Sequence, residues 1–449
     1  MPELGSVTPF VRELSGRARR FEVVPLIFLA VASILAVSAH MQRFPEISPF
    51  DEIVHIDYVR SLQTLEYPRL GETLDQRTFR DWACRGAYTD AVSLPSCLAA
   101  EYDPADFGGH AVQRANHPPV YYAITAVLAT PFVLADNSKL VAGSRLAGAA
   151  FLFLGLAMVY YRARARGVSP LLASATLASV AIGMPTLMHA SATVNNDIAV
   201  FTVGAFCLLV VDRERPFAVT MRWLLAAAVL AGSVKITALF PVVAATTVIG
   251  WQTIGTPYVG RGKKFRQLLM LSSVPVTSFI TAKIWEILGT LRQLDGYRYP
   301  ISGNGRPIDG NPFLGIVRSV GDTIPPTKLN YVPEALQSGS LIEVAAFLGL
   351  VVAAAVGVGL SSNDLRRQAL AVAVVAGSAA TGVVIQFGAA LAGRETKLFP
   401  LVSTRYAMGV IPFVLLLLTH WLDDNRVTRA VAVVVVFVSL YGASTSFLV

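Results

Sequence analysis

The sequence predicts an all-α polytopic membrane protein, and its apolar content is the first reason. Of the 449 residues, 54% are hydrophobic and 15% are charged, which is more apolar surface than a soluble domain of this size needs. The apolar residues recur in blocks of roughly 15–23, near the ~20 residues with which a helix crosses a bilayer. The formal charge of +8 comes from short basic clusters between these blocks. Such clusters are typical of membrane topology signals rather than of nucleic-acid binding.

The first apolar block covers residues 23–40. It follows a basic segment whose arginines are Arg12, Arg17, Arg19 and Arg20. No small-residue cleavage site precedes a mature domain, so we interpret the block as a retained signal-anchor helix rather than a signal peptide. Its basic side is expected in the cytoplasm. Together with the apolar blocks that follow, this predicts a multi-pass protein of the plasma (inner) membrane.

Five further basic clusters mark the loops that are expected in the cytoplasm. These clusters lie at residues 162–166, 213–222, 261–266, 366–367 and 426–429. The remaining connections are then external, namely 42–140, 188–196, a tight turn near Lys235, 287–340 and 391–405.

One apolar stretch does not fit this alternation as a full span. If residues 120–135 and 141–161 both crossed the bilayer, the cluster that begins at Arg162 would lie outside. The first stretch is short and contains Pro131, so we interpret it as a juxtamembrane or re-entrant helix. The sequence thus predicts about eleven transmembrane helices, with juxtamembrane helices in the first external loop.

Two of the three cysteines share that external loop. Cys84 and Cys97 lie in a polar segment outside the cytoplasm, where disulfides persist. We expect them to form a disulfide, with two free loop cysteines as the alternative. Cys207 lies inside an apolar block and is expected to be a packing residue.

An acidic pair stands about ten residues beyond the first span, at the start of the run Asp51-Glu52-Ile-Val-His55. Carboxylates are costly to desolvate at a membrane surface, so their presence there indicates a use. A carboxylate and a histidine one helical turn apart can share a face and take a proton or hold a metal. With hard oxygen ligands, that metal would be Mg or Ca, bound by Asp51, Glu52 and His55.

A structural role for Asp51 is the alternative. Ser48-Pro49-Phe50-Asp51 fits a helix start with a capping serine, a proline in the first turn and an acidic residue three positions later. On this interpretation Asp51 is a capping-box carboxylate, and Glu52 points elsewhere. His55 is then an interfacial histidine satisfied by water.

Two further runs belong to the expected external face. His117-Pro118-Pro119 precedes Tyr121 and Tyr122, so that a rigid proline pair directs the histidine and the tyrosines suit an interface. Asn196 and Asp197 end another hairpin, where an acidic residue also favours the start of a helix. Both runs are candidates for substrate binding, with membrane re-entry and helix capping as the alternatives.

Basic residues also occur on the external side, where the positive-inside rule does not require them. They are Lys235, Arg394, Lys397 and Arg405, the last followed by Tyr406. Each can snorkel to the interface. As a set, they favour an anionic lipid ligand with a phosphate or diphosphate headgroup.

Taken in order, these motifs resemble the GT-C superfamily of membrane glycosyltransferases, which includes protein O-mannosyltransferases, aminoarabinose transferases of lipid A and mycobacterial arabinofuranosyltransferases. The shared elements are the acidic Asp51-Glu52 after the first helix and the Pro118-Pro119 lead-in to the next one. The chain looks most like an uncharacterised bacterial family with Asp-Glu-x-x-His, Pro-Pro-x-Tyr-Tyr, Asn-Asp and Arg-Tyr motifs. The large soluble C-terminal domain of some relatives is absent, so the acceptor would meet the external loops.

The resemblance implies a GT-C-like fold and a polyprenyl-phosphate-linked sugar as donor. Asp51, supported by Glu52, would be the general base for an inverting transfer to a cell-envelope glycan, lipid or protein. His55, His117, Lys235, Arg405 and Tyr406 would hold the donor phosphate. The expected parts are a catalytic module, an external lid and C-terminal helices, over residues 1–286, 287–340 and 341–449.

Two other functions fit parts of the pattern. A transporter or flippase of a lipid-linked sugar would also place charges in a membrane, but no internal symmetry is evident and the charges gather on one face. A non-catalytic scaffold would use Asp51 only as a cap. The Ala-, Val- and Arg-rich composition is compatible with a high-GC actinobacterium, and hence with arabinan or a related envelope glycan as acceptor.

Overall fold

The computed structural model describes most of the chain, and within that part the regular elements are helices, with two isolated β-bridges besides. The described residues are 17–49, 51–87, 94–110, 112–113, 117–211, 215–257, 259–297, 339–392 and 404–447.

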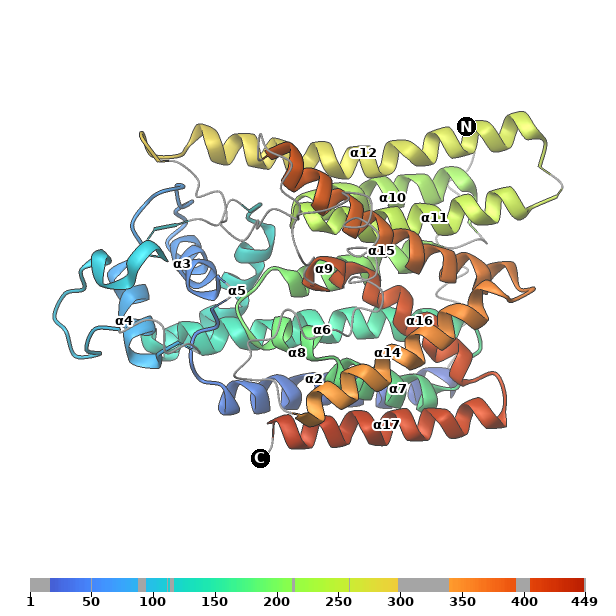
Figure 1. The fold of residues 1–449 in the computed structure, drawn as a ribbon, viewed down its shortest axis with the longest axis horizontal. Helices are drawn as coiled ribbons and strands as arrows, with labels where there is room; N and C mark the ends of the chain where they lie inside the picture. Colours follow the sequence, from blue (N-terminus) through green and yellow to red (C-terminus); the bar gives the residue numbers. More distant parts are fainter. Residues whose placement is uncertain are drawn as a thin grey trace, which may run out of the picture.

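The long helices run side by side, and a smaller group of helices extends from one end of the bundle (Figure 1). The long bundle helices are α2 (Arg17–Arg43), α6 (Leu140–Ala165), α12 (Arg261–Leu291), α14 (Gly339–Leu360), α15 (Leu365–Ala392) and α17 (Arg426–Phe447). Shorter bundle elements are α7 (Pro170–Gly183), α8 (Pro185–Ala192), α9 (Asp197–Val210), α10 (Phe217–Gly232), α11 (Leu239–Gly255) and α16 (Ile411–Leu422), with the 3₁₀ turns η3 (Ile236–Ala238) and η5 (Thr404–Val410). The end group, which we call the outer subdomain, contains α3 (Glu52–Gln63), α4 (Gln76–Arg85), η1 (Pro104–His110) and α5 (Val120–Ala135), with η2 (Asn137–Lys139) joining it to α6.

The helices make this chain an integral multi-pass membrane protein. Among the described residues, seven helices are long and apolar enough to cross a bilayer, or eight if the bent pair α7–α8 forms one span. The apolar helices α5, α9 and α10 are shorter than that test requires. The expected number of about eleven spans therefore stays a prediction.

The helix order places the expected parts of the chain as follows. The boundary that we expected at residue 286 falls inside α12, which continues to Leu291. The expected lid at 287–340 lies largely outside the described residues, since only 287–297 and 339–340 are among them. The C-terminal helices begin with α14 at Gly339.

A sharp bend between α7 and α8 shapes the centre of the bundle. The two helices meet at 81°, at a point where Pro185 has no backbone N–H to continue the ladder of α7. Every residue of α8 is buried, and Gly148 of α6 faces the Ser191 carbonyl so closely that a Cβ there would be 2.0 Å away. Small residues permit such close helix contacts in membranes. The bend thus brings residues 192–196 against α6 and the start of α3.

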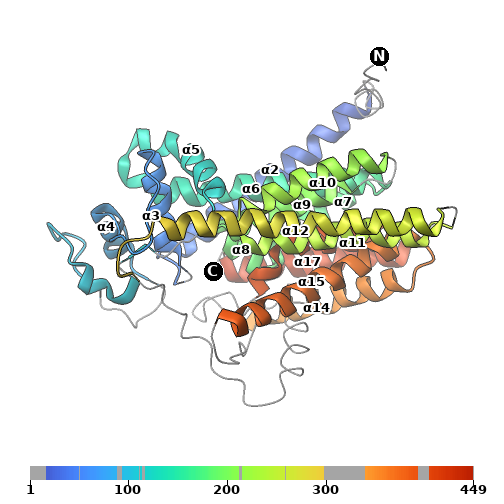
Figure 2. The same cartoon turned by 90° about the horizontal axis from the view of Figure 1, so that it is seen from above.

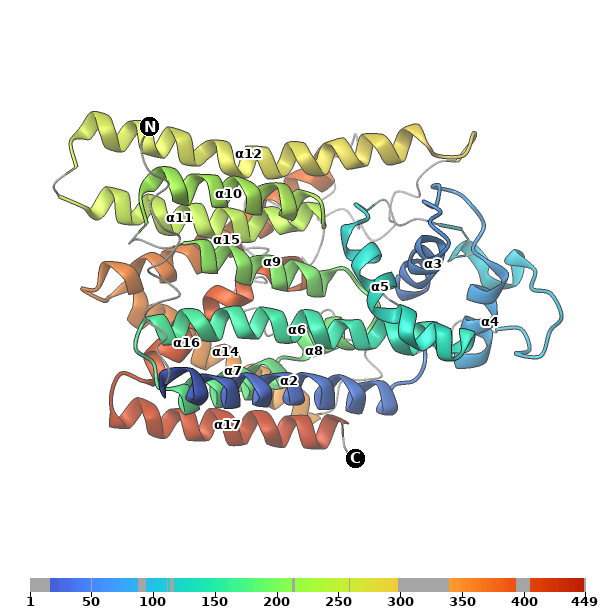
Figure 3. The ribbon, with the colours of Figure 1, turned by 180° about the vertical axis from the view of Figure 1, so that it is seen from behind.

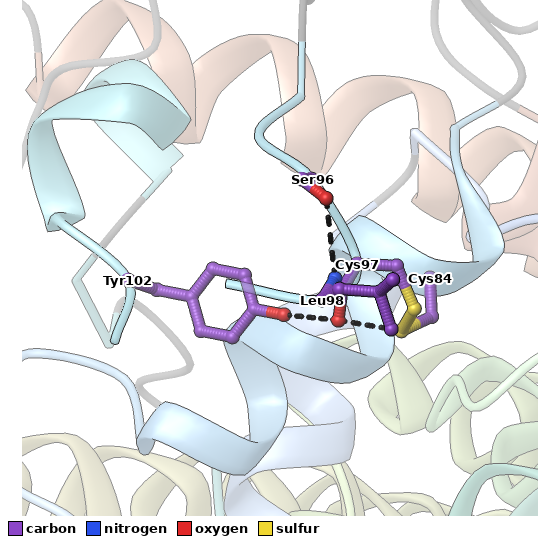
Figure 4. The surroundings of a disulfide bond; sticks show 5 residues. All are labelled: Cys84, Ser96, Cys97, Leu98 and Tyr102. Carbon is purple, nitrogen blue, oxygen red and sulfur yellow. Dashed lines mark hydrogen bonds between the residues drawn. A yellow bond between two sulfur atoms is a disulfide. The ribbon is translucent and has the colours of Figure 1, made fainter. Parts of the chain in front are cut away.

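The outer subdomain is held together by polar contacts around α3. The Asp57 carboxylate accepts hydrogen bonds from the Asp75 N–H (2.9 Å), the Thr78 hydroxyl (2.9 Å) and the Gln113 amide (3.2 Å). It is 4% exposed, and burial raises its pKa despite these donors. A disulfide joins Cys84, at the end of α4, to Cys97, whose carbonyl also accepts a hydrogen bond from Tyr102 (2.8 Å; Figure 4).

The far end of α12 is attached to this subdomain. Arg292 donates to the Tyr67 carbonyl (2.8 Å) and lies over the Tyr67 ring, 4.4 Å from its centroid. The Leu294 N–H donates to the Leu70 carbonyl (3.0 Å). Figure 2 shows α12 running along the whole bundle towards the outer subdomain. These contacts attach the loop that follows α3 to the end of α12.

Candidate functional site

The N-terminal end of α3 rests on a buried ion pair that connects four parts of the chain. Arg145 of α6 donates from Nε and Nη2 to the two Glu52 oxygens, each at 2.8 Å. The Val194 N–H (2.8 Å) and the Ser48 N–H (2.7 Å) donate to the same carboxylate. Arg145 also donates to three carbonyls that follow α2, those of Phe44, Pro45 and Glu46. Glu52 and Arg145 are 0% and 2% exposed, so the pair is a desolvated charge pair with its hydrogen bonds made.

Asp51 lies directly before this ion pair, with an exposed side chain and an unusual backbone. Its φ is +62° and its ψ is +10°, the left-handed region that non-glycine residues seldom adopt. The carboxylate makes no capping hydrogen bond to the helix that follows. Such strain, of order 1–3 kcal/mol, is found where the surrounding structure imposes it, and it concentrates at functional positions.

The expected capping box is therefore wrong in its assignment. The helix begins at Glu52, after the residue that we expected to lie in its first turn. The carboxylate that accepts the Ser48 N–H belongs to Glu52. The Ser48 hydroxyl instead lies 3.1 Å from Nε2 of His189. The carboxylate in the expected capping position is thus that of Glu52. The carboxylate of Asp51 is left without a structural function.

The expected aromatic and histidine residues come together on the other side of α3. The His55 Nδ1 and the Tyr122 hydroxyl are hydrogen bonded at 2.7 Å, and the Asn196 amide donates to that hydroxyl at 3.5 Å. The His55 ring stacks against His117, with centroids 5.7 Å apart. Tyr58, which the sequence analysis missed, stacks on Tyr122 at 3.9 Å and donates to the His117 carbonyl (3.1 Å). Tyr121 packs instead on Phe151, with ring centroids 5.5 Å apart.

Both histidines lie in a positive electrostatic field. Burial, together with the nearby charges of Lys235 and Arg405, lowers the pKa of His117 to about 3. Burial, His117 and the same two cations lower the pKa of His55 well below its usual 6.5. The two rings are therefore neutral at pH 7, and the charge available to an anion at this position comes from the lysine and the arginine.

Acid should weaken the fold through these histidines. Because the folded pKa of His117 is lower than the unfolded one, the unfolded chain binds more protons below pH 6.5, and stability falls as the pH drops towards 3. Between pH 6.5 and 5 the loss is up to about 2 kcal/mol for His117, an upper limit because this ring is partly exposed. We expect His117→Gln to lose less unfolding free energy over that range than the wild type, measured by denaturant titration in detergent. Equal losses in both proteins would contradict this assignment.

Lys235 and Asp197 form a second buried ion pair. The Lys235 Nζ lies 2.6 Å from Asp197 Oδ1, and the residues are 6% and 0% exposed. The lysine sits in the turn between α10 and η3, and Asp197 begins α9, as the sequence predicted. The remaining Asp197 oxygen (Oδ2) and the side-chain amide oxygen of Asn196 (Oδ1) have no hydrogen-bond partner among the described residues. Two N–H bonds of the ammonium are left for a ligand, since its one hydrogen bond in the described structure goes to Asp197.

Arg405 and Tyr406 contact each other in η5, which packs against η3. The guanidinium lies 5.2 Å from the centroid of the Tyr406 ring and donates to its hydroxyl at 3.5 Å. The other two expected cations, Arg394 and Lys397, lie outside the described residues.

Metal binding by Asp51, Glu52 and His55 stays a prediction, and two of these side chains already have partners in the structure. No group of three His, Cys, Asp or Glu side chains that could hold a metal occurs in the described part of the chain. Glu52 already accepts four hydrogen bonds, and the His55 Nδ1 is engaged by Tyr122. The mechanism proposed for this site therefore uses no metal.

The most consequential residue missed by the sequence analysis is Arg145. It lies inside an apolar stretch that we treated as an ordinary span, four residues after its start. An arginine within such a stretch is expensive unless it is paired inside the protein, and that rule is the signal that could have identified it. Figure 3 shows α6 beside α2. Arg145 connects α6 with Glu52 of α3 and with the residues that follow α2.

Comparison with known proteins gives a limited picture. No protein-family model and no curated protein sequence matches the chain. Two solved structures are similar to 88% of this chain and 76% of their own, both of ArnT from Cupriavidus metallidurans. The structure of its apo state shows 17% identity to this chain and a TM-score of 0.37. The structure of ArnT bound to undecaprenyl phosphate shows 16% identity and the same TM-score. At this identity and TM-score, the activity of this chain has to follow from its own residues.

Proposed function

We propose that the protein is a GT-C-type glycosyltransferase that moves a sugar from a polyprenyl-phosphate donor to an acceptor hydroxyl at the outer face of the membrane. The observation that carries the proposal is the uncapped, exposed carboxylate of Asp51, held in a strained conformation at a buried ion pair. Two cations, Lys235 and Arg405, act electrostatically on His55, one helical turn further along α3. A free base and a positive field at one membrane face suit transfer from a lipid phosphate.

In this mechanism the Asp51 carboxylate removes the proton of the acceptor hydroxyl. The hydroxyl oxygen then forms a bond to the anomeric carbon while the bond from that carbon to the phosphate oxygen breaks. The electron pair leaves with the lipid phosphate, and a single displacement inverts the anomeric centre. Asp51 keeps the proton until solvent takes it.

The lysine and the arginine act on the leaving group. As the donor bond breaks, negative charge grows on the phosphate, and preorganised cations in a desolvated site stabilise that charge most. Lys235 is already fixed by Asp197 and offers its remaining N–H bonds. His55 and His117 are neutral, so they contribute hydrogen bonds or ring contacts rather than charge. Asn196, Tyr121 and Tyr122 remain our candidates for sugar contacts.

The first test is transfer from a panel of radiolabelled polyprenyl-phosphate sugars by purified protein in liposomes, with Lys235→Met beside the wild type. We expect transfer by the wild type and a loss of 10²-fold or more in the variant, about the effect of removing one transition-state donor. Because Lys235→Met leaves Asp197 buried without its cation, the double variant Lys235→Met with Asp197→Leu separates loss of folding from loss of activity. Full activity in either folded variant would remove the lysine from the mechanism.

The liposome assay also addresses the competing function. A flippase would move the lipid-linked sugar between leaflets and leave the sugar-phosphate bond intact. If no donor releases its sugar but a labelled donor becomes accessible from the other leaflet, the transferase proposal is wrong. If transfer is seen, a panel of acceptors will identify the substrate. The panel contains envelope glycans, arabinan among them, together with lipids and proteins.

A further inference from the structure

A polar cavity lies at the opposite end of the bundle from the candidate site. It has a volume of about 140 Å³ and is formed by the start of α10, the end of α11 and the start of α12. Lys235 lies at the other end of α10, in the turn that leads through η3 to α11. The residues that line the cavity are Arg215, Phe217, Thr220, Ile249, Gln252, Thr253, Thr256, Val259 and Gln267.

Two buried polar side chains of this lining make no hydrogen bond to the part of the chain that the structure describes. Gln252 is 6% exposed and Thr220 is 2% exposed, and neither side chain is hydrogen bonded to any described residue. A buried carboxamide normally has partners, because desolvating it without them is costly. Both groups line one cavity from neighbouring helices, so the missing partner is expected there.

The charged side chains that the structure describes around the cavity are basic. Arg215 lines it, and none of the described lining residues is acidic. Arg261, Lys263 and Arg266, in the first turns of α12, are exposed beside it. The adjacent faces of α10 and α12 are apolar and exposed, with Trp223 48% and Leu269 63% exposed. Basic pockets between transmembrane helices that border lipid in this way bind phosphate headgroups.

We propose that this cavity binds a phosphate group, carried by an anionic membrane lipid or by a free phosphate compound. The Gln252 amide and the Thr220 hydroxyl donate to the phosphate oxygens, and Arg215 contributes the opposite charge. When the phosphate belongs to a lipid, its acyl chains lie on the apolar faces of α10 and α12. This site is separate from the transferase site and does not depend on that function.

The test compares ligand-dependent thermal stability and lipid retention. Protein in detergent is titrated with phosphatidylglycerol, with phosphatidylcholine and with inorganic phosphate, and retained lipid is counted by native mass spectrometry. We expect phosphatidylglycerol or phosphate to raise the unfolding temperature of the wild type. Gln252→Leu and Arg215→Gln should each weaken that ligand by tenfold or more. Protection by phosphate alone identifies a soluble ligand, and protection by the anionic lipid alone identifies a membrane ligand.

Arg222→Gln is the matched control. Arg222 lies on the same helix as Thr220, is exposed and does not line the cavity. Its loss should leave ligand affinity within twofold of the wild type. The proposal is overturned if Arg222→Gln weakens binding as much as Arg215→Gln, because the effect is then one of surface charge. It is also overturned if folded Gln252→Leu binds both ligands like the wild type, or if neither ligand protects the wild type.

Discussion

Replacing Asp51 with asparagine should reduce sugar transfer by 10²- to 10⁴-fold, the usual contribution of a general base, without harming the fold. The carboxylate is exposed and makes no capping hydrogen bond, so no folded-state contact is lost. Asparagine also tolerates the left-handed region that this position requires. Transfer per mole of folded protein, measured in liposomes, is the deciding quantity.

Asp51→Gly separates strain from chemistry. Glycine adopts φ of +62° without a steric penalty, and this relief offsets the entropy that glycine adds to the unfolded chain. We therefore expect stability within about 1 kcal/mol of the wild type, together with the same roughly 10²- to 10⁴-fold loss of transfer as in Asp51→Asn. The matched control for Asp51→Asn is Asp75→Asn, because Asp75 is an exposed aspartate at the start of α4 and outside the site. Normal transfer by Asp51→Asn would reduce this residue to a structural one.

The largest effect on stability is expected from Arg145→Met. It leaves the Glu52 carboxylate buried without its cation, and breaking a buried pair in this way costs about 3–5 kcal/mol. It also removes the donor to the carbonyls of residues 44–46. The measurement is the free energy of unfolding in detergent, together with the amount of protein recovered from membranes.

Arg164→Met on the same helix provides the comparison. Arg164 pairs with Glu22, but these side chains are 28% and 16% exposed, so its loss should cost about 1 kcal/mol or less. Reversing the central pair, with Glu52→Arg and Arg145→Glu together, should not restore stability. The N–H groups of Ser48 and Val194 require an acceptor where Glu52 stands. A rescued fold in the reversed protein would show that charge alone matters there.

The sequence was most informative where a pattern is local. Apolar blocks predicted membrane helices, and the polar loop with Cys84 and Cys97 suggested the disulfide that the structure contains. The helix start at Asp197 followed from an acidic residue in a first turn. Such features depend on neighbours within a few positions, and periodicity and composition record them.

The parts of the site that escaped prediction depend on distant residues. Glu52 binds Arg145, 93 positions away, and Lys235 binds Asp197, 38 positions away. From the sequence, Lys235 was a candidate cation for a phosphate, and its ion pair with Asp197 was not predicted. The predicted capping box was wrong for the same reason. Arg145 and Val194 bind the Glu52 carboxylate at the position where the local motif would place the Asp51 carboxylate.

The ion pair of Glu52 and Arg145 also sets an order for biosynthesis. The chain is made from its N-terminus, so Glu52 leaves the ribosome well before Arg145, and Val194 follows only after α7 and α8. Until then the carboxylate stays at the membrane surface, because an unpaired charge does not enter the bilayer. The first loop can thus take its final place only when about two hundred residues have been synthesised and inserted. Nascent chains released before that length should leave Glu52 open to water and to proteases.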